Sequence, residues 1–418
     1  MKIAIIGTGI SGMSTAYFLS QKHDVSVFEK EDYVGGHSRT LTFIENSKEI
    51  SVDTGFIVFN HKNYPNLLAL FRHLEVPTIK SNMSFGVSIN NAWLEYGTMK
   101  LSNLFSQKRN FFRPSYLKML QDVLKFNKKA LFYIDNQTDK TIGDMIEDLK
   151  LGEWFKNYYL LPMSGAIWST PVEDMLNFPA ETLVRFFHNH GLLTVDEQPQ
   201  WYTVKGGSKE YVTRLTRNIK KNIQTNLAVS SVTRDKNSAT ITDSNGDKHQ
   251  FDAVIFACHS DQALALIAIP SKEEKSVLGR IQYKPNSVIL HQDSSFMPKR
   301  KSAWSSWVYL SNSNKDKTNK MSLTYWMNSL QSIESTKPIL VTLNPSVKPK
   351  EELIINEHIF DHPQFNQDAI SAQKDIPLIQ GVDKFWFCGA WQKYGFHEDG
   401  LSSAINVVKD FGVKLPWE

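Results

Sequence analysis

Three glycines near the start of the chain have the spacing of a phosphate-binding turn. Gly7, Gly9 and Gly12 form the pattern G-x-G-x-x-G directly after the apolar run Lys2–Ile6. The first glycine allows a tight turn, the second lets the backbone approach a pyrophosphate, and the third lets the next helix pack closely. Glu29 follows Gly12 by 17 residues, near the distance expected for an acid that binds a ribose 2′-hydroxyl. These residues predict a dinucleotide site and favour an unphosphorylated ribose.

The elements around this turn form a strand–helix–strand unit. Lys2–Ile6 and Asp24–Phe28 are short apolar runs rich in β-branched residues, which predict buried strands. Between them, Ser11–Gln21 is predicted to be a helix. Its N-terminal amides and its dipole would favour a phosphate at the glycine turn.

A second glycine pair follows Glu29. Gly35 and Gly36 are followed by His37. This segment resembles the R-x-G-G-R motif of flavoproteins in the glutathione-reductase and amine-oxidase superfamily, with His37 at the second arginine position. Rossmann domains that bind nicotinamide cofactors lack this motif. The resemblance therefore implies FAD, held with a weaker or altered positive charge near its pyrophosphate.

Later segments resemble the same superfamily, in the same order. Val52–Gly55 matches a D-x-G segment beside the flavin ring, although alone it equally fits an ordinary strand end. Gln200–Leu215 resembles a glycine-pair loop near the cofactor, and Val229 matches a valine whose backbone holds the adenine. In Lys384–Lys409, a strand, a turn and a predicted helix Leu401–Phe411 resemble the third motif. The cofactor contacts implied are Gly7, Gly9, Ile10, Ser11, Gly12, Glu29, Lys30, Gly35, Gly36, His37, Ser38, Thr54, Gly55, Phe56, Val229, Gly389, Ala390, Glu398, Asp399 and Leu401.

The resemblance covers nearly the whole chain. The chain is similar to amine-oxidase-like FAD flavoproteins, a family that includes monoamine oxidase, protoporphyrinogen oxidase and phytoene desaturase. It is most similar to bacterial predicted NAD/FAD-binding flavoproteins, in Asp53–Asn60, Leu290–Trp307 and Gly395–Gly400. A similar domain is joined to cyclopropane-fatty-acid synthase in plant proteins. The resemblance thus implies acyl-lipid substrates, with a lipid methyltransferase as a candidate partner.

The same resemblance implies an α/β fold. We expect a Rossmann-type FAD-binding domain of the glutathione-reductase kind, with an inserted α+β substrate-binding domain made of a helical cap and a mixed sheet. The FAD-binding domain would comprise residues 1–77, 201–275 and 375–418. The substrate-binding domain would comprise residues 78–200 and 276–374.

The composition excludes several other classes of protein. The 47 basic residues exceed the 43 acidic ones by only four, too few to indicate nucleic-acid binding. Two cysteines, Cys258 and Cys388, cannot make a disulfide framework or a zinc site, and no metal cluster is expected. No uninterrupted apolar run reaches the roughly 18 residues of a membrane span. We therefore expect a cytoplasmic protein.

The chemistry would be a redox reaction at the flavin. FAD would take a hydride from the substrate and pass the electrons to oxygen or another acceptor. Amine oxidases commonly place a lysine near flavin N5, whereas the matching strand, Asn286–Asp293, contains none. Lys205 and Lys284 are nearby alternatives, each more often structural. His397 matches an aromatic residue that faces the flavin, so it could orient substrate, move a proton or only hydrogen-bond its loop.

The sequence therefore predicts an FAD-dependent oxidoreductase with His397 and Lys205 as candidate catalytic residues. We expect hydride removal from an apolar substrate, a methylated or unsaturated long-chain acyl lipid. One alternative is an amine oxidase acting on a primary or secondary amine. The other is a non-catalytic flavin-binding partner of a lipid methyltransferase.

The segment Lys100–Ile134 is strongly basic and contains a single acid, Asp122. Phenylalanines and leucines are interleaved with its lysines and arginines, as in helices that lie on an anionic membrane surface. A cap helix with its lysines in water is the more common outcome of such a pattern. The alternative is peripheral contact with the inner face of the membrane.

Overall fold

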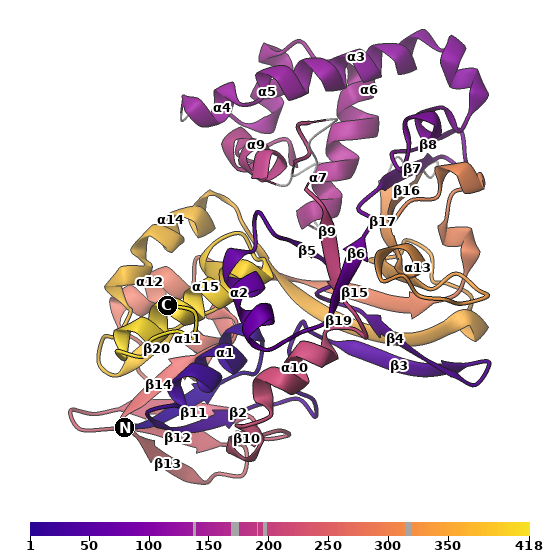
Figure 1. The fold of residues 1–418 in the computed structure, drawn as a ribbon. Helices are drawn as coiled ribbons and strands as arrows, with labels where there is room; N and C mark the ends of the chain where they lie inside the picture. Colours follow the sequence, from indigo (N-terminus) through magenta and orange to yellow (C-terminus); the bar gives the residue numbers. More distant parts are fainter. Residues whose placement is uncertain (137–138, 169–174, 190, 195–198, 314–318) are drawn as a thin grey trace.

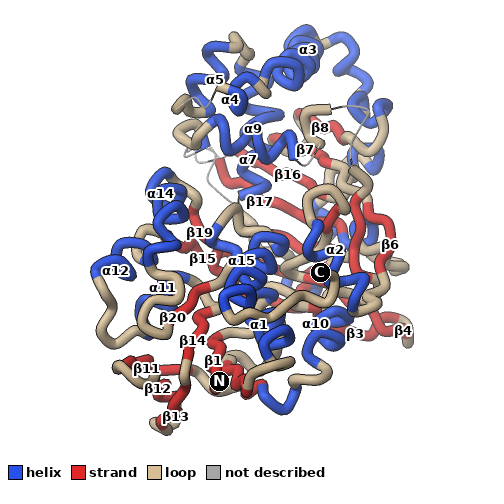
Figure 2. Tube along the Cα trace, turned by 60° about the vertical axis from the view of Figure 1, so that its left-hand side comes forward, coloured by secondary structure: helices blue, strands red, loops and turns tan. Residues whose placement is uncertain are grey.

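Two large sheets and a helical cap form the framework of the protein. The computed structural model describes residues 1–136, 139–168, 175–189, 191–194, 199–313 and 319–418 (Figure 1). A parallel sheet with its helices lies at one end of the molecule, a large mixed sheet lies beside it, and the cap helices lie at the other end (Figures 1 and 2). Within the described residues, no helix is both long and apolar enough to cross a bilayer.

The parallel sheet contains the predicted strand–helix–strand unit. Its five strands run in the order β10-β2-β1-β14-β20, and every pairing is parallel. Both predicted strands have the expected bounds, whereas the predicted helix Ser11–Gln21 runs from Ile10 to Leu19. The strands are β1 (Lys2–Ile6), β2 (Asp24–Phe28), β10 (Ile223–Gln224), β14 (Ala253–Phe256) and β20 (Phe385–Phe387).

Side chains of β1 alternate between two cores. Ile3 and Ile5 belong to the larger core, whereas Ala4 and Ile6 belong to the second. A strand that is apolar on both faces must be covered on both faces. Helices with residues in the larger core include α1 (Ile10–Leu19), α2 (Pro65–His73), α10 (Lys209–Thr216) and α15 (His397–Asp410). Helices with residues in the second are α11 (Ser260–Leu266), α12 (Lys272–Leu278) and α14 (Gln367–Asp375).

A three-stranded antiparallel sheet also packs on the second core. A turn at Asn245–Gly246 joins two of its strands. Its first strand starts at Val229, and before it the Asn226 amide donates to Glu31 O. The strands are β11 (Val229–Arg234), β12 (Ala239–Asp243) and β13 (Lys248–Phe251).

The mixed sheet has seven strands. Their order is β19-β15-β18-β17-β16-β7-β8, with β7 and β16 parallel and the other neighbours antiparallel. The strands are β7 (Phe85–Ile89), β8 (Leu94–Gly97), β15 (Gln282–His291), β16 (Trp307–Ser313), β17 (Asn319–Trp326), β18 (Leu340–Leu343) and β19 (Ile354–Gln364). The short helix α13 (Met327–Leu330) follows β17.

Two small sheets join these parts. One is a hairpin, and in the other a strand after the cap pairs with strands before it. The strands are β3 (Thr40–Glu45) and β4 (Lys48–Asp53) in the hairpin, and β5 (Phe59–Asn60), β6 (Thr78–Ser81) and β9 (Trp201–Val204) in the second sheet.

The cap is helical, but its basic segment is not one helix. Two 3-10 turns, Leu101–Phe105 and Lys108–Phe112, precede a helix that starts at Pro114. Proline has no amide hydrogen and suits the first turn of a helix, so it starts a new helix here. The cap helices are α3 (Pro114–Lys129), α4 (Phe132–Asp135), α5 (Ile142–Asp148), α6 (Glu153–Phe155), α7 (Leu161–Trp168) and α9 (Ala180–Asn189).

Candidate functional site

A cavity of about 780 Å³ lies between the parallel sheet and the mixed sheet. One end is lined by the glycine turn and Glu29, and the other by residues of the mixed sheet and the cap. The predicted cofactor residues that line it are Gly7, Gly9, Ile10, Ser11, Glu29, Lys30, Gly36, His37, Thr54, Gly55, Phe56, Val229, Gly389 and Ala390. His397 lines it as well.

The glycine turn forms an open cradle at one end of this cavity. Gly7 has a positive φ of 102°, and a Cβ on Gly12 would lie 1.9 Å from Gly7 O. By contrast, a Cβ on Gly9 would meet no atom within 4 Å. Gly36 lies against Gly9, since a Cβ on Gly36 would be 3.1 Å from Gly9 Cα. The structure therefore brings the two glycine motifs together around free space next to the N-terminus of α1, where an anion is favoured.

Glu29 is held at the end of β2 by backbone and side-chain donors. Its Oε2 accepts from Thr8 N at 2.9 Å and Thr8 Oγ1 at 2.5 Å, and its Oε1 accepts from Glu31 N at 3.0 Å. The carboxylate is thus fixed beside the glycine turn, where it can accept a hydrogen bond from a hydroxyl in the cavity.

His37 belongs to a group of histidines along the same wall. Its ring stacks on Phe360 at 4.5 Å, and the His362 and His259 rings are centred 5.6 and 6.2 Å away. Burial, followed by the neighbouring histidines, lowers the pKa of His37 well below 6.5, and burial lowers that of His362 to about 4. His37 and His362 are therefore neutral near pH 7. Among the described lining residues, Lys30 is the only lysine, and there is no arginine.

His397 lies at the first turn of α15 and stacks on Phe56, with ring centres 3.8 Å apart. Its Nε2 lies 3.0 Å from both Ser38 Oγ and Tyr211 OH, which also contact each other. Burial lowers the pKa of His397 to about 3, so the ring is neutral at neutral pH. A neutral ring fixed by stacking and two hydroxyls is better suited to positioning than to acid catalysis.

Asp53 connects the D-x-G segment to the loop before α10 by hydrogen bonds. It is fully buried and accepts from Thr40 Oγ1 at 2.6 Å, Ser208 N at 2.8 Å and Gln331 Nε2 at 2.8 Å. Burial raises its pKa to about 6, although these donors oppose the shift. A Cβ on Gly207 would lie 2.6 Å from Thr40 Cγ2, so this second glycine permits the close approach.

Other predicted site residues do not line the cavity but hold it in place. Glu398 accepts from Asn66 N and Leu67 N at the start of α2, at 3.0 and 2.9 Å. Asp399 accepts from Tyr394 N and Phe396 N, which fixes the turn before α15. The remaining members of this group are buried in the packing beneath the turn and helix: Gly12, Gly35, Ser38 and Leu401.

Lys205 is outside the site. Its side chain is exposed and does not line the cavity, and its amide donates to Pro77 O. Lys284 is likewise exposed and does not line the cavity. The candidate catalytic role of Lys205 is therefore withdrawn, because its loop carries the side chain into solvent.

The sequence interpretation did not single out several residues of the site. Tyr211 touches His397 without lining the cavity, and His259, which lines it, stacks on Tyr283 at 4.4 Å. The pattern His358-x-Phe360-x-His362 did carry a signal, because alternate residues of a strand share a face. All three of these β19 residues line the cavity.

The end of the cavity next to the mixed sheet is apolar. Its side chains come from strands of the mixed sheet other than β19, from β9, from the cap and from the loops beside them, and none is charged. They are Met83, Phe85, Met163, Phe186, Leu192, Trp201, Val288, Trp307, Tyr325 and Leu343.

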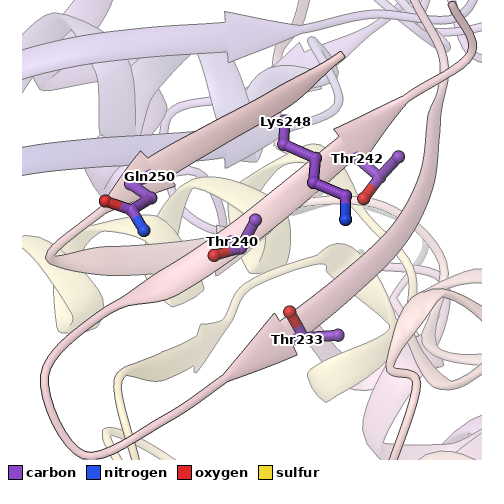
Figure 3. A pocket seen from close by; sticks show the side chains of 5 residues that line it. All are labelled: Thr233, Thr240, Thr242, Lys248 and Gln250. Carbon is purple, nitrogen blue, oxygen red and sulfur yellow. The ribbon is translucent and has the colours of Figure 1, made fainter. Parts of the chain in front are cut away.

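A second hollow, of about 570 Å³, lies on the outer face of β11–β13 (Figure 3). Alternate residues of these strands point inward to the second core, so the five lining residues are those of the solvent face. None of their side chains is buried: Thr233, Thr240, Thr242, Lys248 and Gln250. We assign no chemistry to this hollow.

Comparisons with known proteins agree with this geometry. A family model described as flavin containing amine oxidoreductase matches residues 10–347. No curated protein sequence matches the chain. Similar solved structures include a putrescine oxidase double mutant, with a TM-score of 0.70 and 13% identity over 98% of both chains. A fatty acid isomerase from P. acnes has a TM-score of 0.68 and 14% identity over 98% of both chains.

A third similar structure is cyclohexylamine oxidase from Brevibacterium oxydans, with a TM-score of 0.64 and 16% identity over 98% of this chain and 99% of that one. At such identities, the structures show the fold alone. They confirm the predicted α/β class, with a Rossmann-type domain and a substrate-binding part. The residue boundaries predicted for the two domains stay a prediction.

Proposed function

Since this chain belongs to the family of flavin-containing amine oxidoreductases, it is an FAD-dependent oxidoreductase, and we propose that its substrate is a long-chain acyl lipid. The family, the cofactor and the enzyme class predicted from the sequence are thereby confirmed. Membership of an enzyme family favours catalysis over the alternative of a non-catalytic flavin-binding partner.

The residues along the cavity fit FAD. The space in front of Gly9 has room for a pyrophosphate, and the fixed carboxylate of Glu29 can bind a ribose hydroxyl. Val229 lines the cavity beyond Glu29, where adenine is expected, and His397 and Phe56 line it on the side of the mixed sheet. When bound, FAD supplies the acceptor for a hydride. The chain itself binds and orients the substrate and excludes water.

The apolar wall is the observation that carries the substrate proposal. Its ten side chains, from Met83 to Leu343, include five aromatic rings and no charged group. An acyl chain gains about 0.8 kcal/mol for each methylene that it buries, so such a wall favours a long hydrocarbon. One structure with this fold is named as a fatty acid isomerase, which supports a fatty acyl substrate.

In this proposal, His397 helps to position the substrate. Its stacking on Phe56 and its contacts with Ser38 and Tyr211 fix the ring at the start of α15. Because the ring is neutral, it does not place a charge beside an apolar substrate.

Amine oxidation is the second candidate, since the family is named for it and two similar structures are named as amine oxidases. Against it, neither Lys205 nor Lys284 lines the cavity. A small amine would also leave much of the apolar wall without contacts.

Anaerobic mixing of the yellow enzyme with candidate substrates tests the choice. We expect acyl lipids dispersed in mild detergent to bleach the flavin absorbance, and putrescine and cyclohexylamine to leave it unchanged. Val288→Asp should slow bleaching by acyl lipid, because it places a charge on the buried wall, while bound FAD reports that the variant folds. Val347→Asp is the matched control, since Val347 is 70% exposed. Rapid bleaching by an amine, with none by any acyl lipid, would contradict the proposal.

A further inference from the structure

We propose that the outer surface of the cap around α3 docks on an anionic lipid membrane. The inference is independent of the substrate proposal, because it concerns a surface outside the cavity. Figures 1 and 2 both place α3 at the outer edge of the molecule, at the end opposite the parallel sheet. This docking surface consists of exposed residues between 101 and 132.

The docking surface is unusually rich in exposed apolar side chains. In the part of the chain that the structure describes, seven of the sixteen exposed large apolar residues lie between residues 101 and 132. Phe112 is 88% exposed, Leu101 is 74% and Leu124 is 60%. A monomeric soluble protein rarely gathers so many in one segment without a binding role. The seven are Leu101, Phe111, Phe112, Leu117, Leu124, Leu131 and Phe132.

Helix α3 separates this outer surface from the core of the cap. Tyr116, Met119 and Phe126 are fully buried on its inner side. Leu117 and Leu124 are seven residues apart, almost two turns, so they lie along one stripe on the outer side. The helix thus has an apolar stripe toward the cap and a second one toward solvent.

Basic residues flank the outer stripe. Lys118, Lys128 and Lys129 are exposed and Lys125 is partly exposed, and Lys108 and Arg109 precede the helix with exposed side chains. Lysine stems can lie along apolar surface while their ammonium groups reach the headgroups.

The one acid of the segment, Asp122, offsets only the charge of Lys118. Asp122 is fully buried; its Oδ2 accepts from Gly152 N at 3.0 Å and its Oδ1 from Lys118 Nζ at 2.7 Å. No other acid occurs between residues 100 and 134. An outer surface that is apolar and basic, without exposed acids, is complementary to anionic lipid.

Docking here would bring the cap end of the cavity to the membrane. Met163 of α7 and Phe186 of α9 line the cavity from the cap side, and both helices belong to the same cap as α3. A protein docked through α3 would therefore hold the cap, which lines part of the cavity, against the membrane.

Sedimentation of the FAD-loaded protein with vesicles tests the proposal without turnover. We expect it to pellet with phosphatidylglycerol–phosphatidylcholine vesicles and to remain in solution with pure phosphatidylcholine. Each basic residue near such a surface contributes about fivefold in affinity, so K125E/K128E/K129E should weaken binding by about 100-fold. L117S/L124S should weaken binding as well, because it removes the outer apolar stripe.

The matched control is K272E/K275E/K374E, which makes the same charge change at exposed lysines of α12 and α14. It should bind as the wild type does, and bound FAD should report that every variant folds. The proposal is overturned if the wild type does not pellet with anionic vesicles, if K125E/K128E/K129E binds like the wild type, or if the control weakens binding equally. A second copy of the chain is the competing occupant. A wild-type dimer that L117S/L124S turns into a monomer, with no vesicle binding, would also overturn it.

Discussion

Gly9 and Gly12 belong to one motif but face different neighbours. A Cβ at Gly9 would enter free space, whereas a Cβ at Gly12 would lie 1.9 Å from Gly7 O. We therefore expect Gly9→Ala to weaken FAD binding while changing the melting temperature of the FAD-free protein little. Gly12→Ala should lower that melting temperature, because the backbone of the turn must shift. Thermal unfolding with and without FAD measures both effects, and equal loss of stability in the two FAD-free variants would contradict this interpretation.

His291 supplies a pH dependence that does not involve the cofactor. It is fully buried in β15, its Nε2 lies 2.7 Å from Thr342 Oγ1, and its Nδ1 accepts from Asp293 N. Burial lowers its pKa from 6.5 to about 4. In the unfolded chain His291 is protonated below about pH 6.5, whereas in the folded chain it stays neutral down to about pH 4. The free energy of unfolding therefore falls as the pH falls from 6.5 to 4.

This shift corresponds to roughly 3 kcal/mol between the two ends of the window. His291→Gln cannot titrate, so its free energy of unfolding should fall less between pH 7 and pH 4.5 than that of the wild type. Urea unfolding of the FAD-free proteins at several pH values measures the difference. His362 and His397 have pKa values lowered in the same direction, so a residual slope is expected in the variant. Identical slopes for the two proteins would contradict the assignment.

Single residues also show what the sequence could predict about the site. The glycines and Glu29 were predictable because phosphate and ribose constrain the backbone at fixed spacing. Lys205 was proposed from a resemblance, but its side chain is exposed and does not line the cavity, which only the folded loop could show. The contact of Tyr211 with His397 joins residues 186 apart in the chain, and no local pattern encodes such a pairing.

The start of helix α15 could not be predicted correctly from the sequence. The prediction began this helix at Leu401, but the helix begins at His397. Asp399 accepts from the two amides that precede the helix, and this local capping starts it early. Buried strands such as β1 were predicted with correct bounds, because a short apolar β-branched run leaves few alternatives.

Glu398 gives a prediction about how elements are joined. Its carboxylate accepts hydrogen bonds from Asn66 N, Asn66 Nδ2 and Leu67 N, so it connects α15 to the start of α2. We expect Glu398→Gln to lower the free energy of unfolding of the FAD-free protein by about 1–3 kcal/mol, the usual cost of leaving buried donors poorly satisfied. Chemical denaturation measures this. Glu147→Gln, at an exposed position of α5, is the control and should have little effect. A variant that loses FAD affinity but no stability would favour a direct cofactor contact instead.

At the scale of the whole molecule, the parallel sheet depends on both halves of the chain. β1 and β2 precede residue 30, whereas β10, β14 and β20 follow residue 220. β9 also pairs with β5 and β6 across the cap. We therefore expect fragments 1–200 and 201–418, produced separately, to be digested rapidly by protease. A protease-resistant core in either fragment alone would contradict this dependence.

The same architecture places the apolar wall between the cofactor cradle and the cap. The sequence could predict the presence of a mixed sheet and a cap, but not which side chains would meet in the cavity, since they come from elements far apart in the chain. The substrate proposal therefore rests on the folded wall and not on any one motif.

Mass spectrometry of lipids from cells that contain the wild-type protein, compared with cells that contain Gly9→Glu, tests the central claim most directly. The substitution places a negative charge in the open space at the glycine turn, so the variant should not retain FAD and serves as the inactive control. We predict that wild-type protein depletes one acyl species and produces an oxidised or further unsaturated form of it, absent with the variant. Identical acyl lipids in the two cell populations, with FAD bound to the wild-type protein, would contradict the account.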